Sequence, residues 1–390
     1  MIHDVAIIGA GPAGLCLARA LSGQGLSIVL LERQAETALA DPAFDGREIA
    51  LTHASQALLE QLDLWQRLPA EEVAVLRDAQ VLNGPSLFAL QIRAEQAGAE
   101  RLGHLVANRA IRRAAFDAVA ECADVQLRCE ASVRAIRHAE REVRLELADG
   151  EVLRTRLLVA ADSRFSETRR QLGIGARLKD FGKTMLVCRM QHEQDHQQVA
   201  WEWFGYGQTL ALLPLNGRCS SVVLTLPPRD IERLKALDED AFAREMEQRF
   251  DRRLGAMQLV SSRHAYPLVG AYAQRLIGPR CALIGDAAVG MHPVTAHGFN
   301  FGLSSVQRLA DAVLAAHGKG RDIGSAGVLE RYQRQHRLAT WPLYQATNLL
   351  VDVYTDARLP LKLLRGAGLR VAQGLLPLKK GIARHLTSPG

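Results

Sequence analysis

Apolar residues run almost unbroken over residues 4–8, and a second run, SIVLL, covers residues 27–31. Runs of this kind are typical of strands buried in a parallel sheet. Between them, a glycine turn leads into a helical pattern that ends before Gly25. The order of strand, turn, helix and strand predicts a βαβ unit at the start of the chain.

The middle of the chain has the pattern of a second sheet. The segments TMLVCRM, QTLALLPL and CSSVVLTL predict strands, and DEDAFAREMEQRF predicts an amphipathic helix. Trp201 and Trp203 alternate along one strand, which predicts one packed face of the sheet. A longer helix is expected from residue 298 to about His317.

Length and composition indicate a soluble enzyme. A chain of 390 residues favours two domains, and 48% hydrophobic with 23% charged residues is ordinary for a globular protein. Six cysteines without a C-x-x-C pair argue against a disulfide framework or a zinc site and favour a reducing compartment. No apolar run approaches the roughly 18 residues that span a bilayer, and no signal peptide is apparent. We therefore expect a cytoplasmic protein.

The net charge of +6 belongs to the end of the chain. After Asp356 there is no acidic residue, while seven lysines and arginines follow. On a helical projection these basic residues separate from leucines, which predicts contact with an anionic membrane surface on its inner face or with a partner complex. A helix that docks its apolar side on the body of the protein is the alternative. No nucleic-acid recognition motif accompanies the charge, so no nucleic acid is expected.

Candidate chemistry begins at the first turn. Gly9, Gly11 and Gly14 match G-x-G-x-x-G, in which the glycines permit a tight turn, phosphate approach and close helix packing. The second strand ends at Glu32, where a carboxylate can accept hydrogen bonds from an adenosine ribose. Arg33 beside it is a surface or adenine-edge residue. Together these features predict a dinucleotide site.

Two further acidic residues follow predicted strands. Asp162 lies in LLVAADSRF, and Asp286 lies in RCALIGDAAVGMHP, more than a hundred residues later. Neither His292 nor His297 has a carboxylate or cysteine at a workable spacing, so no metal is expected. Motifs so far apart indicate one extended ligand that a discontinuous domain contacts along its length.

The three motifs, in this order, resemble the aromatic-ring hydroxylase family of FAD-dependent monooxygenases. The resemblance covers residues 1 to about 320, and it implies FAD as cofactor. The resemblance implies that the glycine loop, including Ala13, contacts the cofactor. It also implies that Asp162 organises the adenosine and pyrophosphate region and that Asp286 contacts the ribitol. Arg47 in GREIAL and Arg113 in RAAF match cofactor-side arginines of the family.

The third motif continues as P-x-x-x-x-G-x-N-x-G. By the resemblance, Pro293 fixes a turn beside the flavin, and Gly298 and Asn300 offer amide protons at a helix start, which stabilises negative charge on reduced flavin. Several positions depart from the family pattern: Ser163 replaces glycine, and His297 replaces glutamine as a polar contact near flavin. Ser305 stands where aspartate is usual.

Within this family, the segments GREIALTHASQALLEQLDLW, VANRAIRRAAF and LLRGAGLRVAQGLLPLKK are similar to the ubiquinone-biosynthesis hydroxylases. The fold implied is α/β, with a discontinuous Rossmann-like FAD-binding domain, a second α+β sheet domain for substrate and a helical basic C-terminal segment. We expect residues 1–75, 99–170 and 273–345 in the first domain, 76–98 and 171–272 in the second, and 346–390 in the third.

The expected activity is hydroxylation of a hydrophobic aromatic substrate, a polyprenylated phenol or quinol, by dioxygen. Flavin performs this chemistry, so no catalytic side chain is assigned, and Pro293 and His297 are expected near the flavin. A second nucleotide-binding domain is absent from the pattern, so either visiting NAD(P)H or a separate redox partner reduces the FAD. The alternatives are hydroxylation of a soluble aromatic compound, prenyl reduction, and a non-catalytic flavoprotein that organises a biosynthetic complex.

Overall fold

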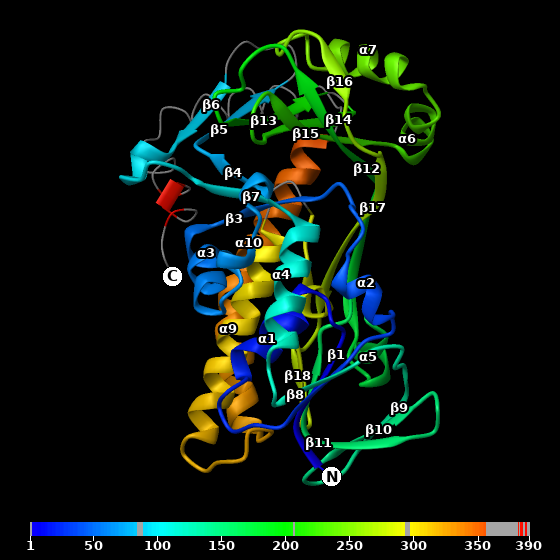
Figure 1. Ribbon diagram of the computed structural model, residues 1–390, viewed down its shortest axis with the longest axis vertical. Helices are drawn as coiled ribbons and strands as arrows, with labels where there is room; N and C mark the ends of the chain where they lie inside the picture. The colour runs from blue at the N-terminus through cyan, green and yellow to red at the C-terminus, as the bar shows by residue number, and fades with distance from the viewer. Residues whose placement is uncertain are drawn as a thin grey trace.

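A computed structural model of the protein describes residues 2–83, 89–205, 207–292 and 297–355, together with residues 381, 383, 384 and 387. Two large sheets and a long helical layer make up this part of the chain (Figure 1). The mixed α/β class expected from the sequence is confirmed. None of the helices in the described ranges combines the length and apolar character needed to cross a membrane.

The first sheet gathers strands from three distant parts of the chain, in the order β18-β19-β11-β1-β2-β8. Strand β1 pairs in parallel with both β2 and β11, and β11 pairs in parallel with β19. All four residues of β2 are buried, as expected of an unbroken apolar run. The sheet comprises β1 (Ile2–Ile8), β2 (Ile28–Leu31), β8 (Val125–Arg128), β9 (Val133–His138), β10 (Val143–Leu147), β11 (Val152–Ala160), β18 (Ile277–Gly278) and β19 (Cys281–Leu283).

Helices cover the first sheet and run along the long axis of the molecule (Figure 1). Helix α9 packs on α1 and on α10, and α1 also packs on α4. Cys16 is completely buried in α1 and is part of the core, as its position in the helical pattern predicts. The helices of this part are α1 (Pro12–Leu21), α2 (Glu36–Ala40), α3 (His53–Gln61), α4 (Asn108–Ala120), α5 (Glu167–Gln171), α8 (Gly285–Ala288), α9 (Gly298–His317) and α10 (Ala326–Thr355).

The second sheet has the order β20-β17-β12-β15-β14-β13-β5-β6, with β16 paired to β12. Every strand expected in residues 171–272 lies in it, and so do the two strands of residues 76–98. The domain boundaries themselves remain a prediction. The strands are β5 (Asp78–Asn83), β6 (Ala89–Arg93), β12 (Ala176–His192), β13 (Val199–Gly205), β14 (Gln208–Pro214), β15 (Cys219–Leu226), β16 (Met257–Leu259), β17 (His264–Ala273) and β20 (Val289–Gly290).

The two faces of the second sheet have different neighbours. Helices α6 (Pro228–Lys235) and α7 (Glu239–Arg249) cover the outer face with buried apolar side chains. Trp201 and Trp203 lie on this outer face beneath the guanidinium of Arg253. Residues of β13 that alternate with the tryptophans therefore lie on the other, inner face.

A small sheet joins the two large ones. It consists of β3 (Glu48–Leu51), β7 (Gly103–Ala107) and β4 (Val73–Leu76), and both outer strands are antiparallel to β7. The inner face of the second sheet meets this region, since Arg189 on β12 bonds to Glu48 and Tyr266 on β17 donates to the carbonyl of Asp45.

Candidate functional site

The glycine loop between β1 and α1 is held too tightly for larger residues. Gly9 has a φ of 106°, and a Cβ there would lie 2.7 Å from the carbonyl oxygen of Ala161. A Cβ on Gly14 would overlap the carbonyl oxygen of Gly9. Gly11 differs, because no atom lies within 4 Å of its missing Cβ. The loop thus presents open backbone at one glycine, as phosphate approach requires.

Glu32 at the end of β2 closes one side of this loop. Its Oε2 accepts a hydrogen bond of 2.7 Å from the amide of Ala10, and its Oε1 accepts one of 3.0 Å from Gln34. The carboxylate is half-buried, while Arg33 beside it is exposed. The acid at this strand end is therefore held in place against the glycine loop.

The three sequence motifs meet in space although they are far apart in the chain. Gly9 touches the backbone of Ala161 and Asp162, and the missing Cβ of Gly285 would lie 2.9 Å from the Cβ of Ala13. Gly285 in turn lies close to Gly302 in the first turns of α9. One continuous cradle results, from the glycine loop through Asp162 and Asp286 to the start of α9.

Asp162 and Asp286 have different surroundings in this cradle. Asp162 accepts hydrogen bonds from the hydroxyl of Ser166 and the amide of Thr168, which fixes the start of α5. Asp286 is more open, with 40% of its side chain exposed, and it pairs with Arg164 at 3.2 Å. Asp286 therefore has acceptor capacity that no other described residue uses.

Asn300 at the start of α9 acts through its side chain. Its Nδ2 donates 2.8 Å to the carbonyl of Ala50, and its Oδ1 accepts 3.2 Å from the amide of Thr52. These bonds tie α9 to the end of β3. The missing Cβ of Gly298 faces open space, and His297 precedes it at the N-cap position. Pro293 lies outside the described residues.

The two predicted arginines both pair with acidic side chains close to them in the chain. Arg47 is exposed, pairs with Asp45 at 2.6 Å and lies over the ring of Tyr266. Arg113 is also exposed and pairs with Asp117 one turn along α4. Arg112, its half-buried neighbour, makes no ion pair or hydrogen bond within the described ranges, so it is the arginine of this helix that is available to an anion.

Sequence reasoning missed two residues that hold the cradle together, Arg169 and Arg164, and it noted Ser305 only as a departure from the family pattern. Arg169 is 4% exposed and donates 2.8 Å to the carbonyl of Ala287, which joins the second motif to the third. Arg164 donates to the carbonyl of Val269 and pairs with Asp286. Ser305 accepts from the amide of Gly285 at 3.0 Å. The spacing Ser166-x-x-Arg169 after Asp162 was the available signal for the first of them.

An ionic cluster joins β3 to the inner face of the second sheet. Arg189 donates 2.8 Å to Glu48 and 2.6 Å to Glu72, and Arg109 also donates to Glu72. The Glu48 side chain is only 1% exposed. Burial raises the pKa of Glu48 to about 7, against the opposing charge of Arg189.

A cavity of about 150 Å³ lies at the inner face of the second sheet, beside α10 and His292 of the third motif. Phe204, Thr209 and Thr225 of the inner face line one side, and His292 lines another. His292 packs edge-on against Phe181 with ring centres 4.6 Å apart. Burial lowers the pKa of His292 to about 4, with a further contribution from Lys179, so this imidazole is neutral at physiological pH. Charged side chains, Lys179, Asp180, Lys183 and Asp352, complete the lining, so the cavity offers both apolar and charged walls.

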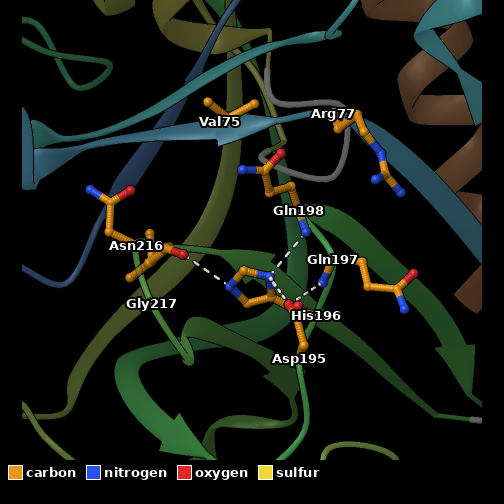
Figure 2. A pocket seen from close by; sticks show the side chains of 9 residues that line it. Val75, Arg77, Asp195, His196, Gln197, Gln198, Asn216 and Gly217 are labelled. Carbon is orange, nitrogen blue, oxygen red and sulfur yellow. Dashed lines mark hydrogen bonds and ion pairs between the residues drawn. The ribbon is translucent and has the colours of Figure 1, made fainter.

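A second cavity, of about 340 Å³, lies at the loops that follow β12 and β14 (Figure 2). The His196 ring accepts 3.0 Å from the amide of Gln198 and donates 2.9 Å to the carbonyl of Leu215. Asn216 donates to the carbonyls of Ala70, Glu71 and Val73. No sequence-predicted site residue lines this cavity, and the polar groups of His196 and Asn216 are engaged by backbone.

Known proteins share this architecture. The crystal structure of p-nitrophenol 4-monooxygenase PnpA from Pseudomonas putida superposes with a TM-score of 0.79 over 98% of this chain and 97% of that one, at 18% identity. PqsL from Pseudomonas aeruginosa, a probable FAD-dependent monooxygenase, has a TM-score of 0.73 over 98% of this chain and 99% of its own, at 21% identity. The fold is that of FAD-dependent monooxygenases.

Sequence similarity gives the family. Residues 3–347 match the family described as FAD binding domain. The chain is 46% identical over 388 residues to ubiquinone hydroxylase UbiM of Neisseria meningitidis, covering 98% of this chain and 84% of that protein. It is 28% identical to the 3-demethoxyubiquinol 3-hydroxylase of Escherichia coli, over 98% and 97% of the two chains. The chain belongs to the FAD-binding domain family, in the group of the ubiquinone-biosynthesis hydroxylases.

The resemblance seen in the motifs is thereby confirmed. The protein is an FAD-dependent oxidoreductase of the hydroxylase type, and FAD is its cofactor. Among the described residues, no group of histidine, cysteine and acidic side chains is arranged to hold a metal ion.

Proposed function

We propose that this protein hydroxylates the aromatic ring of a polyprenylated phenol or quinol intermediate of ubiquinone biosynthesis. The observation that carries the proposal is the 46% identity over 388 residues to a protein named ubiquinone hydroxylase. The cavity beside the inner sheet face supports it, because Phe181, Phe204 and Val351 are part of its walls and can contact an aromatic ring, while the charged side chains there can meet polar ring substituents.

The cradle fits FAD by its donors and by its open backbone. Glu32 would accept from the adenosine ribose, and the space beside Gly11 would admit the pyrophosphate. Asp286, with unused acceptor capacity, would meet ribitol hydroxyls. When bound, FAD supplies the redox chemistry that places one oxygen atom of dioxygen on the ring.

Positive groups on α4 and before β3 would balance the charge of the cofactor. Arg112 is available to a phosphate, and Arg47 and Arg113 stay predicted cofactor-side residues whose present partners are Asp45 and Asp117. The first amides of α9, near Gly298 and Asn300, would stabilise negative charge on reduced flavin, as helix N-termini do. Pro293 and His297 would border the flavin, and Asp162 would order the loop on the adenosine side.

Isotope labelling tests the hydroxylation itself. The purified protein, supplied with a short-chain prenylated phenol, a reductant and labelled dioxygen, should form a product that carries one labelled oxygen atom. Hydroxylation of small soluble phenols alone would favour the soluble-aromatic alternative. Unlabelled product would indicate a prenyl reductase, and no turnover would favour a non-catalytic flavoprotein.

Accumulated intermediates identify the substrate in cells. Mass spectrometry of quinone precursors from cells that lack the protein should reveal one prenylated species with a missing ring oxygen. An unchanged quinone profile would contradict the proposal. NAD(P)H and a separate redox protein are the two candidate reductants, and an assay with each one separately distinguishes them.

A further inference from the structure

The inner face of the second sheet carries two polar side chains for which the structure shows no partner among the described residues. On β13, Glu202 alternates with the outward Trp201 and Trp203, so its side chain lies on the inner face. It is half-buried, yet it makes no hydrogen bond or ion pair within the described ranges. On the neighbouring strand β5, Asn83 is 8% exposed and its buried Oδ1 has no partner. An unused buried polar group is costly, so the Oδ1 of Asn83, with the unpaired carboxyl of Glu202 on the same face, indicates a ligand.

The strand register places both groups next to residues that line the cavity. Glu202 is opposite Val81 and Ala211, and Phe204, two residues further along the same face, is opposite Asn83 and Thr209. Phe204 and Thr209 line the cavity that His292 closes. Diagonal neighbours on adjacent strands are about 7–8 Å apart, so one substituted ring can meet both Glu202 and Asn83.

The residues directly opposite Glu202 are uncharged, and the charged groups at the neighbouring cavity are Lys179, Asp180, Lys183 and Asp352. The neighbours of Glu202 on β14 and β5 are Ala211 and Val81, and Asp352 on α10 is paired with Lys179 at 2.6 Å. Lys183 at the cavity edge donates to the carbonyl of Gly207. Burial is therefore the cause that raises the pKa of Glu202, to about 8. A carboxyl group in this range takes up and releases protons near working pH.

We propose that Glu202 accepts the hydrogen bond of the ring hydroxyl in the aromatic substrate and takes its proton as oxygen is added to the ring. This inference rests on the proposed function. The O–H bond of the ring hydroxyl breaks, an O–H bond forms on the Glu202 carboxylate, and the ring oxygen keeps the electron pair. That pair raises electron density at the ring carbon that receives oxygen from the FAD-dependent reaction. When the ring regains aromaticity by losing its own proton, Glu202 returns a proton to the ring oxygen. Asn83 positions a second ring substituent.

Equilibrium binding tests the acceptor role without turnover. The oxidised holoenzyme is titrated with 2-methoxyphenol carrying one prenyl group, between pH 7 and pH 9, and the flavin absorbance reports binding. Affinity of the wild type should rise with pH as Glu202 ionises. The Glu202→Gln variant should bind with a pH-independent affinity that is about tenfold or more weaker at pH 9, because a charge-assisted bond is lost. Glu330→Gln, the same change at an exposed site on α10, should behave as the wild type.

Turnover tests the base role. The hydroxylation rate of Glu202→Gln should fall about 100-fold or more, with FAD content and thermal unfolding close to the wild type, while Glu202→Asp should retain part of the rate. If Glu202→Gln keeps the wild-type rate and the same pH dependence of binding, the inference is wrong. If the wild type binds the phenol with this pH dependence but adds no labelled oxygen, the proposed function fails and the acceptor role stands.

Discussion

At the scale of single residues, two glycines of the first loop differ in what surrounds them. In Gly11→Ala the new methyl group has room, so the unfolding free energy of the apo protein should stay within about 1 kcal/mol of the wild type. FAD affinity should fall, because the methyl group occupies the space through which phosphate approaches. Gly14→Ala should lower FAD affinity and should also lower the unfolding free energy by about 1–3 kcal/mol, because its Cβ overlaps the Gly9 carbonyl. Urea unfolding and FAD titration of the apo proteins measure the two effects. Equal FAD affinity in Gly11→Ala and the wild type would contradict the phosphate assignment.

Asp286 gives a second prediction at this scale. Asp286→Ala removes ribitol acceptors, so the FAD dissociation constant should rise about 5- to 100-fold. Apo stability should change by no more than about 1 kcal/mol, because the pair with Arg164 is partly exposed, at 29% and 40%. Fluorescence titration with FAD checks the first value and urea unfolding the second, with Asp311→Ala on the exposed side of α9 as control. Full FAD retention in Asp286→Ala would count against the role.

Much of the site could be predicted from single residues, because each site residue lies in a short motif directly after a strand. The glycines, Glu32 and the two aspartates follow strands directly, and such short patterns encode a turn and its ligand together. The choice between Arg112 and Arg113 as the anion-binding arginine could not be predicted in this way. The two neighbours differ in which side of α4 they occupy, and only packing shows that Arg113 is exposed and already paired.

At the scale of elements, the link between β3 and β12 makes a prediction about pH. Arg189→Met leaves the buried Glu48 without its cation, and the pKa of Glu48 should rise further above its usual value. A raised carboxyl pKa means that the folded state binds the proton more tightly than the unfolded state. The stability deficit should therefore be small near pH 5 and grow as pH rises through 7, to about 3 kcal/mol at pH 8.

Urea unfolding of Arg189→Met at both pH values measures this deficit. The Glu48→Gln/Arg189→Met double variant is the matched control, because it removes the buried Glu48 charge while Glu72 keeps Arg109, and it should lose most of the pH dependence. A deficit of equal size at pH 5 and pH 8 would show that Arg189 contributes by packing on Phe44 rather than by charge.

The elements themselves could be predicted from periodicity. Strands β14 and β15, helix α7 and the span of α9 lie where the hydrophobic patterns placed them. Strand order could not be predicted, because pairing such as β13 with β5 joins residues more than a hundred positions apart. No local pattern indicates which strand will be the neighbour.

At the scale of the whole molecule, the basic C-terminal segment is predicted to bind an anionic membrane surface or a partner complex. Residues 356–380 lie outside the described part of the structure, so membrane or complex association rests on the sequence alone. Flotation with anionic liposomes should carry the full chain, weaken with added salt and disappear when residues 357–390 are deleted, since each basic residue near such a surface contributes about 1 kcal/mol. Neutral liposomes are the control. Equal flotation of the shortened protein would reject membrane binding by this segment.

The sequence by itself determined the cofactor class, the family and the order of the cradle motifs, because each depends on residues close together in the chain. Tertiary structure decided what those motifs meet: Ala13 against Gly285, Arg164 with Asp286, and Arg189 between Glu48 and Glu72. It also decided that Glu202 faces inward while its tryptophan neighbours face outward beneath Arg253. The physical reason is that side-chain partners and burial depend on the packing of distant elements, which no single stretch of sequence specifies.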